Sequence, residues 1–203
     1  MSDYFKEISF LGSYPDVKIC PSHKFREYAF IGRSNVGKSS LINYLSNNAS
    51  LAKTSKKPGK TQMINIFTVD KSWCMVDLPG YGYAVASKKN RQLWKKMIYG
   101  YLESRENLVN TFVLLDSRLE LQQIDLEFIN WLGKKGLPFS IIYTKMDGIT
   151  KQKKDSNIEI IQSALLEYWD ELPRQFRTSS AHKEGREDIL QYIVDINDSF
   201  SKK

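Results

Sequence analysis

The sequence predicts an α/β fold with a mainly parallel, six-stranded sheet that has helices on both faces. Two observations carry this prediction. Short apolar segments alternate along the chain with longer segments of helical spacing. Two of the apolar segments, residues 111–116 and 139–144, are continuous, as in strands buried on both faces. Such alternation is typical of parallel sheets, because a helix must connect each strand to the next.

The individual elements follow in order along the chain. The apolar segments are expected to form strands at residues 27–32, 63–69, 73–78, 111–116, 139–144 and 176–179. The segments with helical spacing are expected to form helices at residues 38–47, 88–104, 124–135, 157–169 and 186–198. The third of these helices ends at a clear stop signal, the Gly-Leu-Pro sequence at residues 136–138.

Composition places the chain among ordinary globular proteins. It has 203 residues, of which 41% are hydrophobic and 26% charged, so we exclude intrinsic disorder and fibrous repeats. No Pro/Gly/Ser-rich linker divides it, and we expect one domain at residues 24–203 after an N-terminal extension at residues 1–23. Apolar runs are far shorter than the ~20 residues of a membrane span. The first residues do not resemble a secretory signal, and two cysteines are too few for a disulfide framework. We expect a cytoplasmic protein.

The loop between the first strand and the first helix has the strongest signal for chemistry. Its sequence, GRSNVGKS, fits the pattern G-x-x-x-x-G-K-[ST] of a phosphate-binding loop. In this pattern the glycines allow backbone N–H groups to surround phosphates, the lysine reaches the β- and γ-phosphates, and the serine hydroxyl ligates Mg²⁺. The residues of this loop are Gly32, Arg33, Ser34, Asn35, Val36, Gly37, Lys38 and Ser39.

A second element lies at the end of the strand at residues 73–78. Its sequence is Asp77, Leu78, Pro79 and Gly80. An acid at this position can hold Mg²⁺ through a water molecule, and the Gly80 N–H can bond a γ-phosphate. D-x-x-G alone is a weak signal, because many turns contain Asp and Gly. After a phosphate-binding loop it supports a nucleoside triphosphate site.

The third element indicates which base is bound. Thr144, Lys145, Met146 and Asp147 follow the buried strand at residues 139–144. The Asp147 carboxylate can accept hydrogen bonds from N1–H and the N2 amino group of guanine, which adenine cannot donate. Two such bonds at about 1.5–3 kcal/mol each discriminate by about 10²–10⁴-fold. By itself Asp147 could equally be an acidic residue at a helix start. In order after the first two elements, it favours guanine.

Basic residues concentrate in one part of the chain. Residues 53–96 contain only two acids, Asp70 and Asp77, and ten basic residues: Lys53, Lys56, Lys57, Lys60, Lys71, Lys88, Lys89, Arg91, Lys95 and Lys96. This segment therefore accounts for all of the net charge of +7. A solvated face is the simplest interpretation of a charge run, but its position beside the phosphate motifs favours a polyanionic partner such as RNA.

Together the motifs resemble a known protein family. In order, GRSNVGKS, PGKT, DLPG, TKMD and TSSA are similar to the five signature elements of translation-factor-type GTPases. More narrowly, GRSNVGKSSLIN, KPGKTQMIN, VDLPGYGYA and the TSS sequence that leads to Gly185 resemble the EngB (YihA/YsxC) family, in the TrmE–Era–EngA–EngB–septin superfamily. The resemblance spans roughly residues 24–200 and implies a Ras-like P-loop GTPase fold.

The resemblance also implies roles for further residues. Thr61 is expected to join Ser39 as a ligand of Mg²⁺, and Lys38, Thr61 and Asn35 are expected to serve hydrolysis. The residues expected to lie over the nucleotide are Gly59, Lys60, Thr61, Gln62 and Met63. The residues expected to contact guanine O6 through backbone N–H groups are Thr178, Ser179 and Ser180.

Three positions stand out against the wider GTPase pattern. Thr144 replaces an asparagine that commonly braces the base-binding loop, and we expect little loss of guanine selectivity. Tyr81 follows Gly80 where many GTPases have a glutamine that orients the attacking water. Hydrolysis must then rely on another group. Asn35 is one candidate, because it stands at a position where related potassium-activated GTPases have an asparagine as an ion ligand. By this resemblance its side-chain carbonyl could hold K⁺ beside the phosphates; its amide could instead only brace the backbone of residues 59–63.

The function expected from this sequence is that of a slow GTPase that acts in assembly of the large ribosomal subunit. GTP and Mg²⁺ would order two basic segments, residues 53–60 beside PGKT and residues 88–96 after DLPG. These segments would dock on rRNA, and hydrolysis would release them. By the resemblance the protein is needed for growth and cell division. We expect a monomer that binds neither membrane nor DNA. An ATPase or phosphotransferase is disfavoured by Asp147, and a purely structural RNA-binding protein by the ordered motifs.

Overall fold

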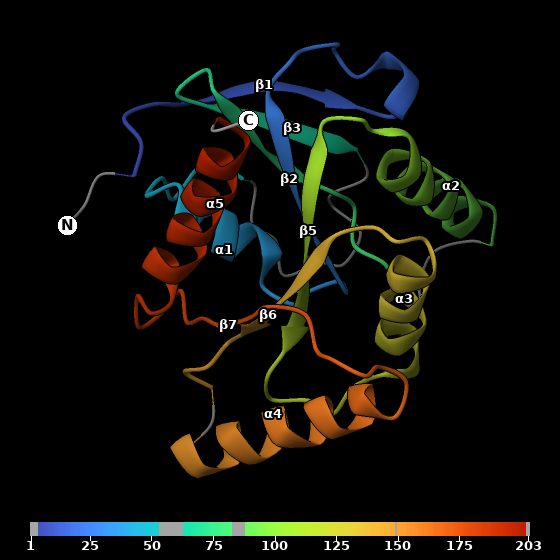
Figure 1. The fold of residues 1–203 in the computed structure, drawn as a ribbon, viewed down its shortest axis with the longest axis vertical. Coiled ribbons are helices and arrows are strands. Elements are labelled where there is room, and N and C mark those ends of the chain that lie inside the picture. The colour runs from blue at the N-terminus through green and yellow to red at the C-terminus, as the bar shows by residue number, and fades with distance from the viewer. Residues whose placement is uncertain (1–3, 53–62, 83–87, 149, 202–203) are drawn as a thin grey trace.

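A computed structural model describes residues 4–52, 63–82, 88–148 and 150–201 of the chain, and its centre is a seven-stranded sheet (Figure 1). The strands are β1 (Ile8–Tyr14), β2 (Arg26–Gly32), β3 (Ile64–Val69), β4 (Trp73–Asp77), β5 (Leu108–Asp116), β6 (Phe139–Thr144) and β7 (Gln175–Arg177). The helices are the short 3₁₀ helix η1 (Val17–Ile19) and α1 (Lys38–Leu45), α2 (Lys88–Ser104), α3 (Gln123–Lys134), α4 (Lys151–Leu166) and α5 (Arg186–Ser201).

The order of strands across the sheet is β1-β3-β4-β2-β5-β6-β7. The pairs β4–β2, β2–β5, β5–β6 and β6–β7 are parallel, whereas β1–β3 and β3–β4 are antiparallel. The expected mainly parallel α/β fold is therefore confirmed. All six expected strands and five expected helices are present, with shifts of a few residues at most ends; α4 begins six residues earlier than its apolar spacing suggests.

The sheet has seven strands and not the six expected, because β1 forms within the segment that the sequence analysis assigned to an N-terminal extension. This strand pairs only with β3 and is largely exposed, so it lacks the apolar pattern of a buried strand. Its start is fixed by a side chain from another element. The Asp70 carboxylate, in the β3–β4 turn, accepts hydrogen bonds from the backbone N–H groups of Lys6 and Glu7.

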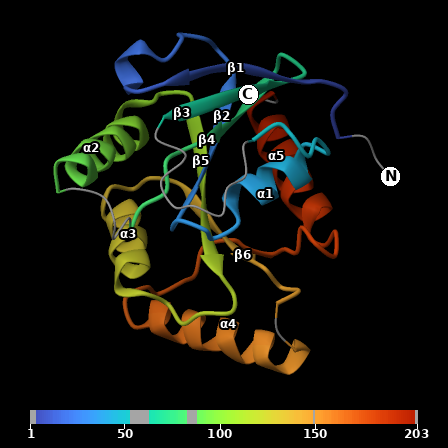
Figure 2. The ribbon, with the colours of Figure 1, turned by 180° about the vertical axis from the view of Figure 1, so that it is seen from behind.

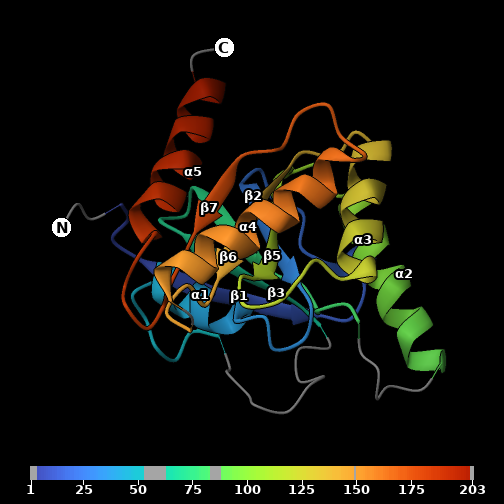
Figure 3. The same ribbon diagram turned by 90° about the horizontal axis from the view of Figure 1, so that it is seen from below.

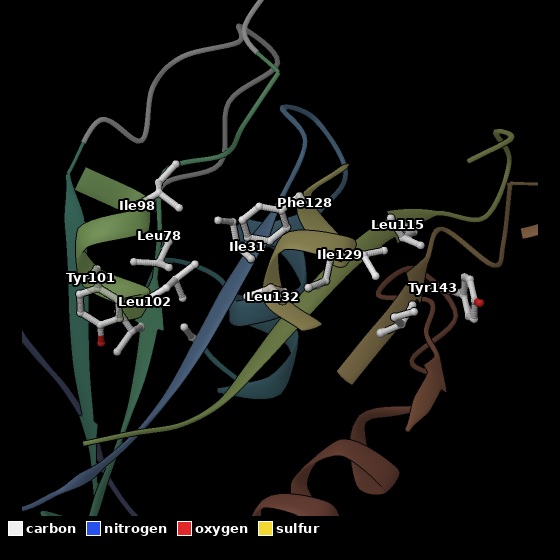
Figure 4. Packing of buried hydrophobic residues seen from close by; sticks show 14 of the residues in the cluster. Ile31, Leu78, Ile98, Tyr101, Leu102, Leu115, Phe128, Ile129, Leu132 and Tyr143 are labelled. Carbon is white, nitrogen blue, oxygen red and sulfur yellow. The ribbon is translucent and has the colours of Figure 1, made fainter. Parts of the chain in front are cut away.

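The helices cover both faces of the sheet. Figure 2 shows α1 and α5 on one side and α2 and α3 on the other, and Figure 3 shows α4 beside β6 and β7. Alternating residues of β2 divide between two apolar cores: Tyr28 and Phe30 pack with α1 and α5, while Ala29 and Ile31 pack with α2, α3 and α4. Figure 4 shows the second core, in which side chains of α2 and α3 meet the strands.

Candidate functional site

The carboxyl ends of the parallel strands β2, β5 and β6 lie side by side, next to the amino end of α1. This edge is where parallel α/β sheets bind ligands. The phosphate-binding loop at residues 32–39 connects β2 to α1 here. Four sets of contacts connect this loop and the other motifs to one another.

Glycine is required at two positions of the loop. A Cβ atom at Gly32 would lie 2.7 Å from the backbone oxygen of Leu114, and Gly37 has a φ of 107°, which L-residues rarely adopt. Asn35 has a φ of 63°. The Ser34 hydroxyl is buried and has no hydrogen-bond partner among the residues that the structure describes. Since an unpaired buried hydroxyl is costly, a ligand with acceptor oxygens such as phosphate would fit here.

The first motif contact joins Lys38 to Asp77. The Lys38 ammonium, at the start of α1, forms an ion pair with the Asp77 carboxylate at the end of β4, and both residues are over 90% buried. Burial lowers the pKa of the Lys38 ammonium, whereas contact with a carboxylate favours its charged form. Ser39 lies next to this pair and is half-buried. A serine hydroxyl and a carboxylate are hard oxygen ligands of the kind that Mg²⁺ prefers.

The second contact explains why threonine can replace asparagine in the base-binding loop. The Thr144 hydroxyl lies 2.6 Å from the carbonyl oxygen of Val36 and 3.2 Å from that of Leu115. A side chain at position 144 thus still braces the phosphate-binding loop. Only the chemistry of the brace differs, since a hydroxyl serves here where an amide is common.

The third contact runs from the next residue of the same motif. Lys145 has a φ of 61°, and its ammonium donates hydrogen bonds to the carbonyl oxygen of Asn35, at 2.5 Å, and to the Asp116 carboxylate, at 2.8 Å. Burial acts to raise the pKa of Asp116, but hydrogen bonds from Arg118 and Lys145 outweigh it and lower that pKa. The Lys145 side chain therefore crosses between the phosphate-binding loop and the end of β5.

The fourth contact brings the last motif to the base-binding loop. The Ser179 hydroxyl donates a 2.6 Å hydrogen bond to the exposed Asp147 carboxylate, and the Met146 N–H bonds the Thr178 carbonyl at 3.1 Å. Gly185 closes this segment with a φ of 77°, and a Cβ there would collide with the Arg177 carbonyl. The motifs at residues 32–39, 77–80, 144–147 and 178–180 thus form one site.

Some of the expected site residues cannot be located in this way. Gly59, Lys60, Thr61 and Gln62 lie outside the described residues, and Met63 is half-buried immediately before β3. Of the ten basic residues in the charged segment, Lys71, Lys95 and Lys96 have described side chains, and all three are exposed.

The Tyr81 side chain is directed toward α3. Its hydroxyl donates a 3.0 Å hydrogen bond to Asp125, and its ring packs on Phe128 with a centroid distance of 4.7 Å. The other carboxylate oxygen of Asp125 lies 2.9 Å from Nε of Arg33 in the phosphate-binding loop. A cavity of about 330 Å³ lies beside Tyr81, between the Gly80–Gly82 segment, α2 and α3. The sequence analysis did not identify Asp125.

A signal for Asp125 was present in the sequence. The buried positions of α3 are Asp125, Phe128, Ile129 and Leu132, which follow the i, i+3, i+4, i+7 spacing of an apolar helix face. An acid on such a face is unusual and requires a polar partner. That partner could not be found from spacing alone, because Arg33 and Tyr81 are distant in sequence.

A similar cluster lies at the opposite end of β2. Glu27 is fully buried and accepts hydrogen bonds from Nε and Nη2 of Arg105, at 2.8 and 2.7 Å, and from the Tyr101 hydroxyl. Nε2 of His23 lies 3.1 Å from the same carboxylate, and 3.9 Å from the sulfur of Cys74. The sequence analysis identified none of these contacts.

The described part of the chain also bears on metal binding and on membrane spanning. No group of three or more His, Cys, Asp or Glu side chains there could hold a metal ion. None of its helices combines the length and apolar character needed to cross a membrane.

Comparison with known proteins adds to this geometry. Residues 27–145 match the family model described as 50S ribosome-binding GTPase. A probable GTP-binding protein EngB of Porphyromonas gingivalis is 52% identical, over 98% of each chain. A protein of the same name from Christiangramia forsetii is 51% identical, over 96% of this chain and 98% of its own.

Solved structures share the fold. The crystal structure of a probable GTP-binding protein engB covers 85% of this chain and 99% of its own, with a TM-score of 0.67 and 23% identity. Era in complex with MgGDPNP and nucleotides 1506–1542 of 16S ribosomal RNA covers 87% of this chain and 57% of its own, with a TM-score of 0.62 and 21% identity. At these identities the likeness concerns the fold alone.

Proposed function

The chain belongs to the EngB family of GTP-binding proteins and is a GTPase, and from this premise we propose that it acts in assembly of the large ribosomal subunit, in the cytoplasm. GTP and Mg²⁺ order two basic segments that dock on rRNA, and hydrolysis releases them. By the family resemblance this activity supports growth and cell division. The observation that carries the proposal is the single site into which the four nucleotide motifs are joined. In the sequence, the basic residues 53–60 flank the PGKT motif, and residues 88–96 follow the DLPG motif.

The phosphates are assigned to the loop at residues 32–39. In this proposal Lys38 exchanges its contact with Asp77 for the β- and γ-phosphates, and the Ser34 hydroxyl, which has no partner in the described part of the chain, supplies a further donor. Ser39 and Thr61 are the proposed ligands of Mg²⁺, with Asp77 acting through water. The bound ion would neutralise charge on the phosphates. The Gly80 N–H is assigned to the γ-phosphate.

Guanine is assigned to the loops at residues 144–147 and 178–180. Asp147 accepts from N1–H and the N2 amino group, and the stem of Lys145 lies along the base. The N–H groups of Thr178 and Ser179 already bond the carbonyls of Tyr143 and Glu184. Among residues 178–180, we therefore assign the contact with guanine O6 to the N–H of Ser180.

Asn35 has two proposed roles that one measurement separates. Its side chain is exposed beside the phosphate-binding loop. If it helps to hold K⁺, the cation stabilises negative charge that develops during hydrolysis, and turnover is faster in KCl than in NaCl. If it only braces residues 59–63, single-turnover rates in the two salts are equal at matched ionic strength.

The RNA-docking proposal is tested by neutralising the basic segments. We expect that replacing Lys56, Lys57, Lys88 and Lys89 by Ala weakens binding to large ribosomal subunits in the presence of GDPNP, while GTP affinity of the free protein is retained. If these lysines contact phosphates, the slope of log K against log salt becomes shallower, by about 0.9 per lost contact for a duplex and about 0.7 for a single strand. Pelleting assays across a salt series measure both effects.

The matched control removes four positive charges from exposed positions outside residues 53–96: Lys18, Lys134, Lys153 and Lys183. It should leave subunit binding and its salt slope close to those of the unmodified protein. Equal losses in the two variants would show that net charge alone determines binding, and unchanged binding in the first variant would remove the docking proposal.

A further inference from the structure

Three contacts fix the position of Tyr81, the residue that follows Gly80. Its backbone N–H bonds the carbonyl of Gly32 at 3.2 Å, its hydroxyl bonds Asp125 at 3.0 Å, and its ring packs on Phe128. A parallel bridge also pairs it with Arg33. The residue that occupies the usual glutamine position is therefore fixed, and its side chain contacts α3.

Asp125 connects Tyr81 to the phosphate-binding loop. One oxygen of this buried carboxylate accepts from Tyr81, and the other pairs with Nε of Arg33. Asp125 lies in the first turn of α3, where the helix dipole favours negative charge. Through one carboxylate, the residue after Gly80 and the residue after Gly32 are held relative to each other.

We propose that Tyr81, Asp125 and Arg33 form a positioning unit that fixes the Gly80 N–H relative to the phosphate-binding loop and so favours binding of a nucleoside triphosphate over the diphosphate. The inference rests on the proposed assignment of the Gly80 N–H to the γ-phosphate. A donor that is already ordered does not lose conformational freedom when the ligand binds. GDP has no γ-phosphate and gains nothing from this order.

The hydroxyl of Tyr81 separates positioning from packing. Tyr81→Phe retains the ring against Phe128 but removes the bond to Asp125. Tyr101→Phe is a matched control, because Tyr101 donates its hydroxyl to another buried carboxylate, Glu27, at the opposite end of β2. If Tyr81 served only to fill the core, phenylalanine would replace it without any change in nucleotide preference.

Calorimetric titration with GDPNP and with GDP tests the inference. Tyr81→Phe should weaken GDPNP binding about fivefold to tenfold, as expected for the net loss of one hydrogen bond, and leave GDP affinity unchanged. Tyr101→Phe should leave the ratio of the two affinities unchanged. Asp125→Asn should lower the same ratio, and combining it with Tyr81→Phe should add little, since both variants break one unit.

The other outcomes of these titrations distinguish failure of the positioning unit from failure of the proposed function. If the unmodified protein binds neither guanine nucleotide, the proposed function fails. If it binds both and Tyr81→Phe leaves the ratio unchanged, the positioning unit is wrong while the proposed function stands. If Tyr101→Phe lowers the ratio as much as Tyr81→Phe, general loss of rigidity explains the effect and the inference is overturned.

Discussion

Two clusters lie at opposite ends of β2, and each is made of an acidic residue, an arginine and a tyrosine. At its amino end Glu27 binds Arg105 and Tyr101, and at its carboxyl end Arg33 and Tyr81 bind Asp125. Each contains a buried carboxylate, a guanidinium and a tyrosine hydroxyl. The resemblance of the two clusters shows that buried polar chemistry alone does not identify a functional site. The two clusters differ in the segments that they join.

The Glu27 cluster joins elements of the scaffold. Its arginine makes two hydrogen bonds to the carboxylate, and a histidine contact is added to the tyrosine, so the charge is fully enclosed by partners. The Asp125 cluster makes fewer contacts and joins the two segments that we propose bind phosphate. Its arginine side chain is 24% exposed. The first arrangement serves stability, and the second is suited to positioning.

The largest expected effect is on stability, at the scaffold end. Glu27→Ala leaves the Arg105 guanidinium and the Tyr101 hydroxyl without their carboxylate in a buried site. Breaking a buried ion pair in this way costs about 3–5 kcal/mol of unfolding free energy. Urea denaturation without nucleotide measures this loss. The ratio of GDPNP to GDP affinity should not change, and a change would contradict the assignment of this cluster to the scaffold.

A smaller loss of stability is expected at the nucleotide end. Asp125→Ala removes the shared carboxylate, but the partly exposed Arg33 can turn to water, so we expect a cost of about 1–3 kcal/mol. The same urea experiment measures it. A loss as large as that of Glu27→Ala would mean that the two clusters do not differ in the way described.

The smallest expected effect concerns the contact of His23 with Glu27, which has no counterpart in the Asp125 cluster. His23→Ala removes one neighbour of Glu27, while Arg105 and Tyr101 remain bound to it. We expect a loss of about 0.5–1.5 kcal/mol, the net value of one hydrogen bond, with no change in nucleotide affinity. A loss comparable to that of Glu27→Ala, measured by the same unfolding transition, would show that His23 is the main partner of Glu27.

The sequence allowed the local parts of the site to be predicted. The loop at residues 32–39 and the motifs at residues 77–80 and 144–147 are contiguous, and their conformations depend on glycines and strand ends that can be read along the chain. The structure joins these motifs, and the brace formed by Thr144 agrees with the expectation that threonine is tolerated there. Their roles toward the nucleotide stay predictions.

The rest could not be predicted because it depends on contacts distant in sequence. Tyr81 was recognised as unable to act as glutamine does, but its direction toward α3 depends on a carboxylate 44 residues away. His23 belongs to none of the sequence motifs, yet it lies beside Glu27. The strand β1 was missed for a related reason. An exposed strand at the edge of a sheet requires no apolar alternation, and its register is set by β3.

The position of β1 has a practical consequence for work with shortened proteins. β1 occupies the hydrogen-bonding groups along one side of β3, and Asp70 holds its beginning. A protein trimmed at residue 24, where the nucleotide motifs suggest that the domain starts, would present β3 as a bare edge. Bare edges recruit strands from other molecules. Self-association or poor yield of such a fragment would then reflect an artificial truncation, and the native oligomeric state should be measured with residues 4–23 retained.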